Sequence, residues 1–96
     1  MTVRYTDAAL AEIDDILEYI ARDNPVAANE VSLAIENTVA LIQGQPRMAH
    51  IVYRGMVRAF PVGDDHPYRI FYQVKPGEIV IRNVRHTRRQ QPWEGE

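Results

Sequence analysis

The chain contains no cysteine, which excludes disulfide bonds, thiolate zinc sites and a thiol nucleophile. No apolar run approaches the roughly 18 residues that a membrane-spanning helix needs, and the polar residues 1–7 do not fit a secretory signal. Internal repeats and low-complexity segments are also absent, and His50 and His66 show no metal-ligand spacing. We therefore expect a cytoplasmic protein that binds no metal and no cofactor and does not associate with a membrane.

With 96 residues, the chain is long enough for one domain, which we expect to span residues 1–89, followed by a tail at 90–96. A chain of this length buries roughly 60–65% of its unfolded surface, enough for one modest core. Its hydrophobic fraction of 46% and charged fraction of 25% are those of an ordinary globular protein.

The charges are distributed unevenly between the two halves. Residues 1–46 hold two arginines against eight acidic residues, whereas residues 47–96 hold eight arginines and one lysine against five acidic residues. The segment from Arg82 to Arg89 contains four arginines and no acidic residue. The second half can therefore attract nucleic acid or an acidic protein segment, although a solvated surface of mixed charge is the plainer alternative.

The start of the chain predicts a short strand and a helix. Residues 2–5 alternate apolar and polar side chains, and Thr6 or Asp7 can cap the helix that follows. This helix should end by Asp23 because the next residues lead into a proline. Its apolar positions recur at steps of three and four, and they are Leu10, Ile13, Ile16, Leu17 and Ile20.

A second helix is expected immediately afterwards. Asn24 suits the N-cap, Pro25 suits the first helical position, and Gly44 suits the end. The apolar stripe comprises Val31, Ala34, Ile35, Thr38, Leu41 and Ile42. So short a link between two amphipathic helices implies an antiparallel helical hairpin.

The second half predicts strands. Residues 45–56 lack a clear period, and we expect a loop there. Residues 56–62 should form a strand, in which Pro61 indicates an edge or an irregularity because proline cannot donate to a neighbouring strand.

Two longer strands, at residues 68–74 and 78–86, should form a hairpin, with Gly77 supplying the positive φ of its tight turn. Strict alternation along the last strand would place Ile79 and Ile81 on one face and Val84 and His86 on the other. A β-bulge, which is one extra residue in the strand, near Arg82 and Asn83 would bring all four to the same face. We therefore predict a bulge at this position.

The order β-α-α-β-β-β indicates an α+β fold in which an N-terminal antiparallel helical hairpin packs on a small antiparallel β-sheet. The helix-facing side of the strand at 68–74 should carry Tyr68, Ile70, Tyr72 and Val74. The open side should carry Arg69, Phe71 and Gln73.

We expect this open face to carry Arg58 and Arg69, with His86 and Arg88 nearby. Such a set suits two kinds of chemistry. It can cleave RNA, with His86 exchanging protons and arginines stabilising the charge that develops on the phosphate. It can also bind a partner by gripping carboxylates bidentately.

Three segments in this order and spacing, Val57–Val62, Tyr68–Val74 and Ile79–Arg89, resemble the RelE/ParE toxin superfamily, most closely its ParE, or plasmid-stabilisation, branch. Tyr19-Ile20 near the end of the first helix and the segment 46–48 fit the same family, so the resemblance covers nearly the whole chain.

The resemblance implies the toxin of a type II toxin–antitoxin system, an inhibitor of DNA gyrase rather than an enzyme. A cognate antitoxin would neutralise it in a hetero-oligomer through an extended acidic or amphipathic segment, and direct DNA binding is not expected without that antitoxin. No catalytic residue is expected. The candidate residues for antitoxin or target binding are Arg58, Arg69, Phe71, Arg85, His86, Arg88, Arg89 and Trp93.

Two alternatives remain open. RelE-type relatives cleave ribosome-bound mRNA, and here Arg58, Arg69 and His86 would be the catalytic candidates, although ParE-like sequences share these elements. The other alternative is a non-toxic interaction module. Structural roles are also open for single residues: Arg69 can pair with Asp64 or Asp65, and Trp93 can anchor the tail on the protein's own surface.

Overall fold

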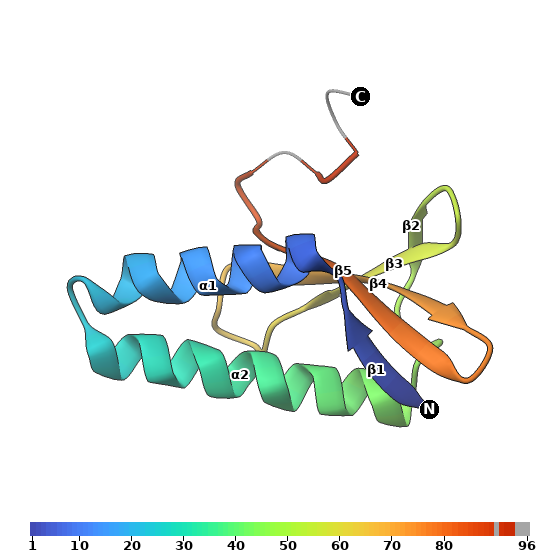
Figure 1. Ribbon diagram of the computed structural model, residues 1–96, viewed down its shortest axis with the longest axis horizontal. Helices are drawn as coiled ribbons and strands as arrows, with labels where there is room; N and C mark the ends of the chain where they lie inside the picture. The colour runs from blue at the N-terminus through green and yellow to red at the C-terminus, as the bar shows by residue number, and fades with distance from the viewer. Residues whose placement is uncertain (90, 94–96) are drawn as a thin grey trace.

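The computed structural model describes residues 1–89 and 91–93, so positions 90 and 94–96 of the expected tail lie outside the described residues. Figure 1 shows two long antiparallel helices beside a twisted sheet, with the chain leaving the sheet beyond its last strand. The elements are, in order, β1 (Thr2–Tyr5), α1 (Asp7–Ala21), α2 (Pro25–Gly44), β2 (Ile51–Tyr53), β3 (Val57–Pro61), β4 (Tyr68–Lys75) and β5 (Glu78–His86).

The first helix begins and ends where the sequence predicts. Thr6 is its N-cap, and the Thr6 hydroxyl accepts a hydrogen bond from the backbone N–H of Ala9 at 3.1 Å. Four of the five predicted stripe residues pack against the core, namely Ile13, Ile16, Leu17 and Ile20. The prediction for Leu10 was wrong: its side chain is exposed, because the start of α1 turns the fully buried Ala9 toward the core instead.

The second helix starts at Pro25, with Asn24 as its N-cap. Its buried residues are Ala28, Val31, Ile35, Thr38, Val39 and Ile42. The prediction for Leu41 was wrong, since that side chain is half exposed and Val39 takes a place in the core. The helix does end at Gly44, but φ is not positive there, and the C-cap is Gln45, with φ −141° and ψ 69°.

The five strands lie in the order β1-β5-β4-β3-β2. β1 runs parallel to β5, and the other neighbours are antiparallel, so the expected antiparallel sheet contains one parallel pair. The prediction of a loop throughout 45–56 was wrong, because residues 51–53 form the edge strand β2. Both Ile51 and Val52 are exposed, so β2 has no alternation of buried and exposed side chains that would have revealed it.

The hairpin of β4 and β5 follows the prediction closely. Lys75 pairs with Glu78 across the turn, where Gly77 has a φ of 72°. Phe71 pairs with Asn83 whereas Tyr72 pairs with Ile81, so Arg82 is the extra residue of a β-bulge. The bulge that the sequence predicts is therefore confirmed.

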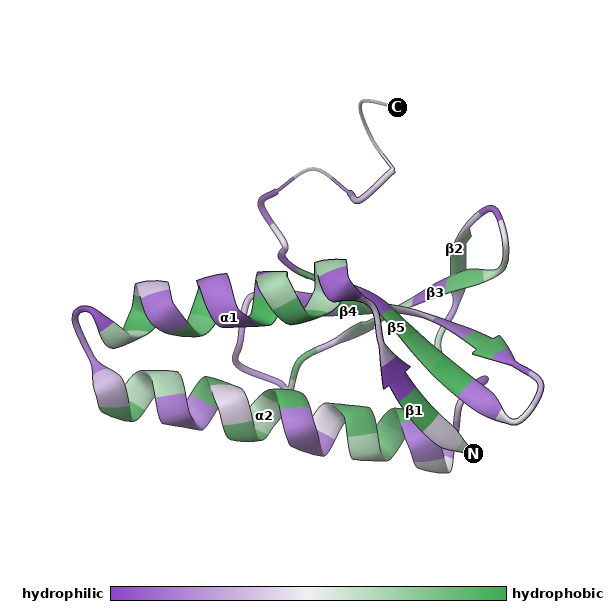
Figure 2. Ribbon diagram, viewed as in Figure 1, coloured by the Kyte–Doolittle hydropathy of each residue, from purple (hydrophilic) through white to green (hydrophobic). Residues whose placement is uncertain are grey.

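One face of the sheet packs against the helices and forms the core. Its strand residues include the pairs Ile70–Val84, Tyr72–Ile81 and Val74–Ile79, and Figure 2 shows the hydrophobic residues concentrated along β4 and β5. Among the described residues, no helix has both the length and the hydropathy needed to cross a membrane.

Candidate functional site

The sheet has a second face, turned away from the core and here called the outer face. Because directly opposed residues share a face, it carries Arg69 with Arg85, Phe71 with Asn83, and Gln73. Residues 91–93 lie against this face. The Trp93 ring stacks on Tyr53 of β2 with a centroid distance of 4.4 Å and meets the edge of Phe71 at 5.5 Å.

Phe71 lies on the outer face together with Arg69, as the sequence predicts, but that face is not open at this residue. Phe71 is only 2% exposed, because Trp93 covers it in an edge-to-face contact. Trp93 therefore anchors the chain after β5 on the protein's own surface, which is the structural role that the sequence left open.

A cleft of about 380 Å³ opens between the β2–β3 hairpin, Trp93 and the start of α1, and we call it the Arg82 cleft. Its polar lining includes Arg54, Gln73 and Arg82, and its aromatic lining includes Tyr53 and Trp93. No acidic residue within the described part of the chain lines it. The cleft is therefore an electropositive site with an aromatic wall.

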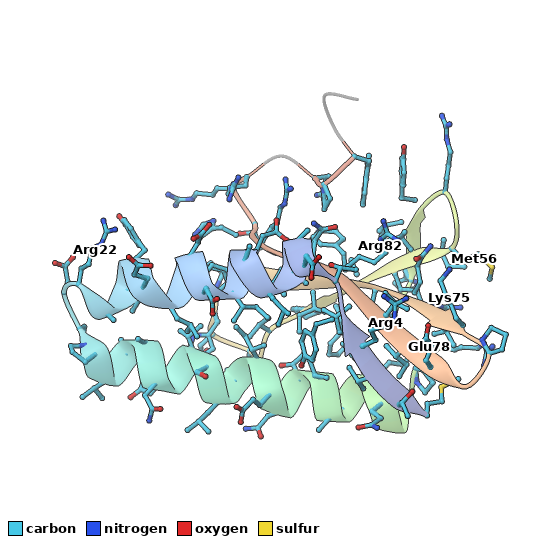
Figure 3. The ribbon with its side chains drawn as sticks, in the orientation of Figure 1. Arg4, Arg22, Met56, Lys75, Glu78 and Arg82 are labelled. Carbon is cyan, nitrogen blue, oxygen red and sulfur yellow. The ribbon has the colours of Figure 1, made fainter. Side chains whose placement is uncertain are left out.

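The bulge determines where Arg82 points. The Thr6 hydroxyl donates to the carbonyl oxygen of Arg82 at 2.9 Å, and the Thr6 N–H donates to the carbonyl of Ile81 at 3.0 Å. The Arg82 side chain donates to Oε1 of Gln73, and Gln73 in turn donates to the carbonyl of Gly55 at 2.7 Å. This chain of hydrogen bonds links the bulge to the tip of the β2–β3 hairpin, and Figure 3 shows Arg82 and Met56 on this side of the molecule.

A carboxylate holds the strand beyond the bulge. Glu12 on α1 accepts hydrogen bonds from Nε of Arg85 at 2.7 Å, from the side-chain amide of Asn83 at 3.0 Å and from the N–H of Val84 at 3.2 Å. The two charged side chains, Glu12 and Arg85, are 15% and 22% exposed. Arg85, a candidate for partner binding, is thus engaged within the protein.

Arg58 does not share a face with Arg69, contrary to our expectation. Arg58 pairs with Tyr72, a core residue, and its Nη1 donates to the carbonyls of Ala49 at 2.6 Å and Arg47 at 3.2 Å. The Tyr72 hydroxyl donates to the carbonyl of Pro46 at 2.8 Å. Together the two side chains attach the segment after α2 to the sheet, so Arg58 has a structural role.

His86 also lies on the other face from Arg69, because it pairs with Tyr68. Its ring meets the edge of Tyr68 at 5.4 Å, and its Nδ1 accepts a hydrogen bond from the N–H of Arg88. Tyr68 and Tyr72 are four residues apart on β4, so the strand positions of His86 and Arg58 are offset by about 13 Å along the strand direction, and β4 lies between them. The three candidates for RNA cleavage therefore do not converge on one point.

Three candidate arginines remain available on the surface. Arg69, Arg88 and Arg89 are exposed, and none forms an ion pair within residues 1–89 and 91–93. Arg69 thus does not pair with either Asp64 or Asp65.

Three tyrosines have raised pKa values, and in each case burial is the main cause. Burial raises the pKa of Tyr72 despite the opposing effect of the Arg58 guanidinium. Burial raises the pKa of Tyr68, and burial together with the Glu36 carboxylate raises the pKa of Tyr5. Residues 1–89 and 91–93 contain no group of three acidic or histidine side chains placed to hold a metal ion.

Arg54, Gln73 and Arg82 were not among the site residues predicted from the sequence, and Glu12 was not predicted as the partner of Arg85. The predicted bulge was a usable signal for Arg82, because the extra residue of a bulge turns away from its neighbours. Glu12 lies beside the apolar stripe of α1, four residues before Ile16, a place where a carboxylate is partly buried and needs a partner.

Two comparisons with known proteins gave matches. The family model described as the ParE toxin of type II toxin-antitoxin system, parDE, matches residues 3–91. Among solved structures, the chain is similar to a chain from the chromosomal ParDE TA system from P. aeruginosa, with a TM-score of 0.79 and 21% identity over 90% of this chain and 95% of that one. That likeness concerns the fold. No curated protein matches the chain significantly.

Proposed function

Because the chain belongs to the ParE family of type II toxins, we propose that it arrests growth by inhibiting DNA gyrase and that a cognate antitoxin neutralises it. The family match spans residues 3–91, which include both helices, strands β2 to β5 and all of β1 except its first residue. The antitoxin is proposed by analogy with the ParDE system whose fold the chain shares.

The placement of three residues supports a mode of action other than RNA cleavage. A ribonuclease needs its proton-exchanging group and its phosphate-stabilising cations within reach of one phosphodiester. Here Arg69 lies on the outer face, whereas Arg58 and His86 lie on the core side of the sheet and are held by backbone and ring contacts. This separation is the observation that favours a binding toxin.

We propose that the antitoxin binds at Arg69, Arg88 and Arg89. These three arginines are exposed and form no ion pair with the described residues, so their guanidinium groups can bind carboxylates. An acidic segment of the antitoxin has the complementary charge.

Expression in a bacterial host tests the proposal. Induction of the protein alone should stop growth, and co-expression of the protein encoded directly upstream should restore it. Replacing Arg69, Arg88 and Arg89 by alanine should weaken this rescue if the antitoxin sits there. Arg22→Ala is the matched control, because Arg22 is an exposed arginine at the far end of α1.

Three outcomes would contradict parts of the proposal. Unchanged growth after induction, with the protein present and folded, would favour a non-toxic interaction module. Cleavage of messages, detected by primer extension on RNA from arrested cells, would favour an mRNA endoribonuclease. Full rescue of the triple variant would place the antitoxin elsewhere.

A further inference from the structure

The exposed side of α1 carries two carboxylates without a partner inside the described chain. Asp14 and Asp15 are exposed, and neither forms an ion pair among residues 1–89 and 91–93. They lie on the side of the helix opposite the apolar stripe that packs on the core. Exposed carboxylates are ordinary on a surface helix, so this face acquires a meaning only from what lies beside it.

Two exposed arginines, also without an ion pair in the described part of the chain, lie beside the same helix. The N–H of Arg88 donates to Nδ1 of His86 at 3.0 Å, and the His86 ring meets the edge of Tyr68 at 5.4 Å. Tyr19 of α1 lies near enough to Tyr68 to contribute, after burial, to its raised pKa. Arg88 and Arg89 therefore begin where the second half of α1 lies against the end of β5. Figure 1 shows the chain beyond β5 leaving on the α1 side of the molecule, away from α2.

One side of the molecule thus carries two adjacent patches of opposite charge, Asp14 with Asp15, here called the acidic patch, and Arg88 with Arg89, the basic patch. A twofold axis in the plane of contact, between the patches, places the acidic patch of each copy opposite the basic patch of the other. A second copy of the chain is therefore complementary to this side at two places. An acidic or a basic segment would match only one patch, and the acidic patch repels nucleic acid.

Apolar surface is available at the same place. Tyr19 is 73% exposed, more than any other large hydrophobic residue among the described part of the chain, and Leu10 is 49% exposed earlier on the same helix. Tyr19 follows Asp15 by one helical turn and lies near Tyr68, so a contact that joins the two patches also covers its ring. Tyrosine and arginine are enriched in protein–protein interfaces, where they supply much of the binding energy.

We propose that a second copy of this chain docks on this side, in a symmetric dimer that joins the acidic patch of each copy to the basic patch of the other around Tyr19. Self-association does not rest on the proposed function. If the proposed function holds as well, the antitoxin and the second copy compete for Arg88 and Arg89, and antitoxin binding would dissociate the dimer.

Sedimentation velocity of the full-length protein over a series of concentrations measures the dissociation constant of the dimer. We expect reversible dimerisation that weakens as the salt concentration rises, because exposed charges are screened. Tyr19→Ala removes an exposed ring and should weaken dimerisation by about tenfold or more.

Charge reversal tests the pairing of the patches. One double variant combines Asp14→Lys with Asp15→Lys, and the other combines Arg88→Glu with Arg89→Glu. Each should weaken dimerisation by at least about tenfold, because like charges then oppose each other. An equimolar mixture of the two should dimerise again, since the lysines of one variant meet the glutamates of the other and the remaining patches still match. Restoration in the mixture separates a lost contact from a folding defect.

Glu30→Lys is the matched control, because Glu30 is an exposed carboxylate on α2, and it should dimerise like the natural sequence. Circular dichroism confirms that each variant is folded. A natural sequence that stays monomeric at every concentration, normal dimerisation of Tyr19→Ala or of either double variant, or a mixture that stays monomeric would each overturn the inference. Dimerisation of a protein that neither arrests growth nor inhibits gyrase would leave the inference standing and remove the proposed function. Growth arrest by a protein that never dimerises would do the opposite.

Discussion

The carboxylate of Glu12 lies 2.7 Å from Nε of Arg85, in an ion pair that joins α1 to the strand beyond the bulge. β1 pairs with β5 only as far as Ile81, so the edge of β5 after that residue has no neighbouring strand among the described residues. Thr6 and Glu12 bind this edge instead, through the carbonyls of Ile81 and Arg82 and the N–H of Val84. The start of α1 thus completes the sheet where β1 ends.

We predict that Glu12→Ala lowers the free energy of unfolding by about 2–3 kcal/mol, because it removes the carboxylate that accepts hydrogen bonds from Nε of Arg85, the side-chain amide of Asn83 and the N–H of Val84. Urea unfolding followed by circular dichroism measures the change. Glu18→Ala is the control: its pair with Arg22 is highly exposed and 3.7 Å long, so its cost should stay within about 0.5 kcal/mol. Equal costs for the two variants would show that Glu12 has no special role.

Thr6 has two roles, as N-cap of α1 and as donor to the bulge. Thr6→Ala should therefore lower the free energy of unfolding by about 2 kcal/mol, and Thr6→Ser should recover most of it. Asn24→Ala removes only a cap, that of α2, and should cost about 1 kcal/mol. The same urea titration compares the three variants. A cost of Thr6→Ala no larger than that of Asn24→Ala would contradict the second role.

Stability should depend on pH in the alkaline range. Burial raises the pKa of Tyr72 above its ordinary value of 10.0, so the unfolded chain releases this proton first. The stabilisation is fully present below about pH 10 and is lost as the pH rises through the higher pKa of the folded state. Tyr72→Phe should cost about 1 kcal/mol at neutral pH, through the lost hydrogen bond to Pro46, and should show a shallower alkaline decline.

Urea unfolding at a series of pH values from neutral to alkaline tests this. Parallel curves for Tyr72→Phe and the natural sequence would mean that other groups, such as Tyr68 and Tyr5, account for the decline.

Three glycines allow a matched comparison of backbone effects. Gly77 and Gly55 both have positive φ, so alanine should cost about 1 kcal/mol at either position. Gly55→Ala should cost more, because the added Cβ would lie 3.0 Å from Nε2 of Gln73 and disturb the Gln73 contact. Gly44→Ala should be neutral or stabilising by about 0.5 kcal/mol, since Gly44 is helical with open space around it. Thermal unfolding ranks the three, and an inverted order for Gly55 and Gly44 would contradict this account.

Much of the fold was predictable because its signals are local. Thr6, Asn24 and Pro25 specify the helix starts, and the turn at Gly77 fixes the register of the β4–β5 hairpin. The bulge at Arg82 was predictable because the alternation of apolar and polar residues along β5 is interrupted there. Without an extra residue, the apolar side chains after this point would lie on the opposite face of the sheet from those before it.

The rest depends on contacts between distant parts of the chain. β2 carries exposed Ile51 and Val52, so no periodicity marks it. Arg58 lies on the core side of the sheet because it pairs with Tyr72. The sequence of β3 alone does not specify this pairing. Glu12 and Arg85 are 73 residues apart, and their ion pair exists only because α1 crosses the edge of β5.

Gyrase supercoiling in vitro tests the central claim most directly. Purified protein added to gyrase and relaxed plasmid should inhibit supercoiling, and prior addition of the antitoxin should restore it. A parallel translation reaction containing the same protein should show intact message by primer extension. Normal supercoiling at protein concentrations that cleave the message would contradict the account, and the chain would then be an mRNA endoribonuclease.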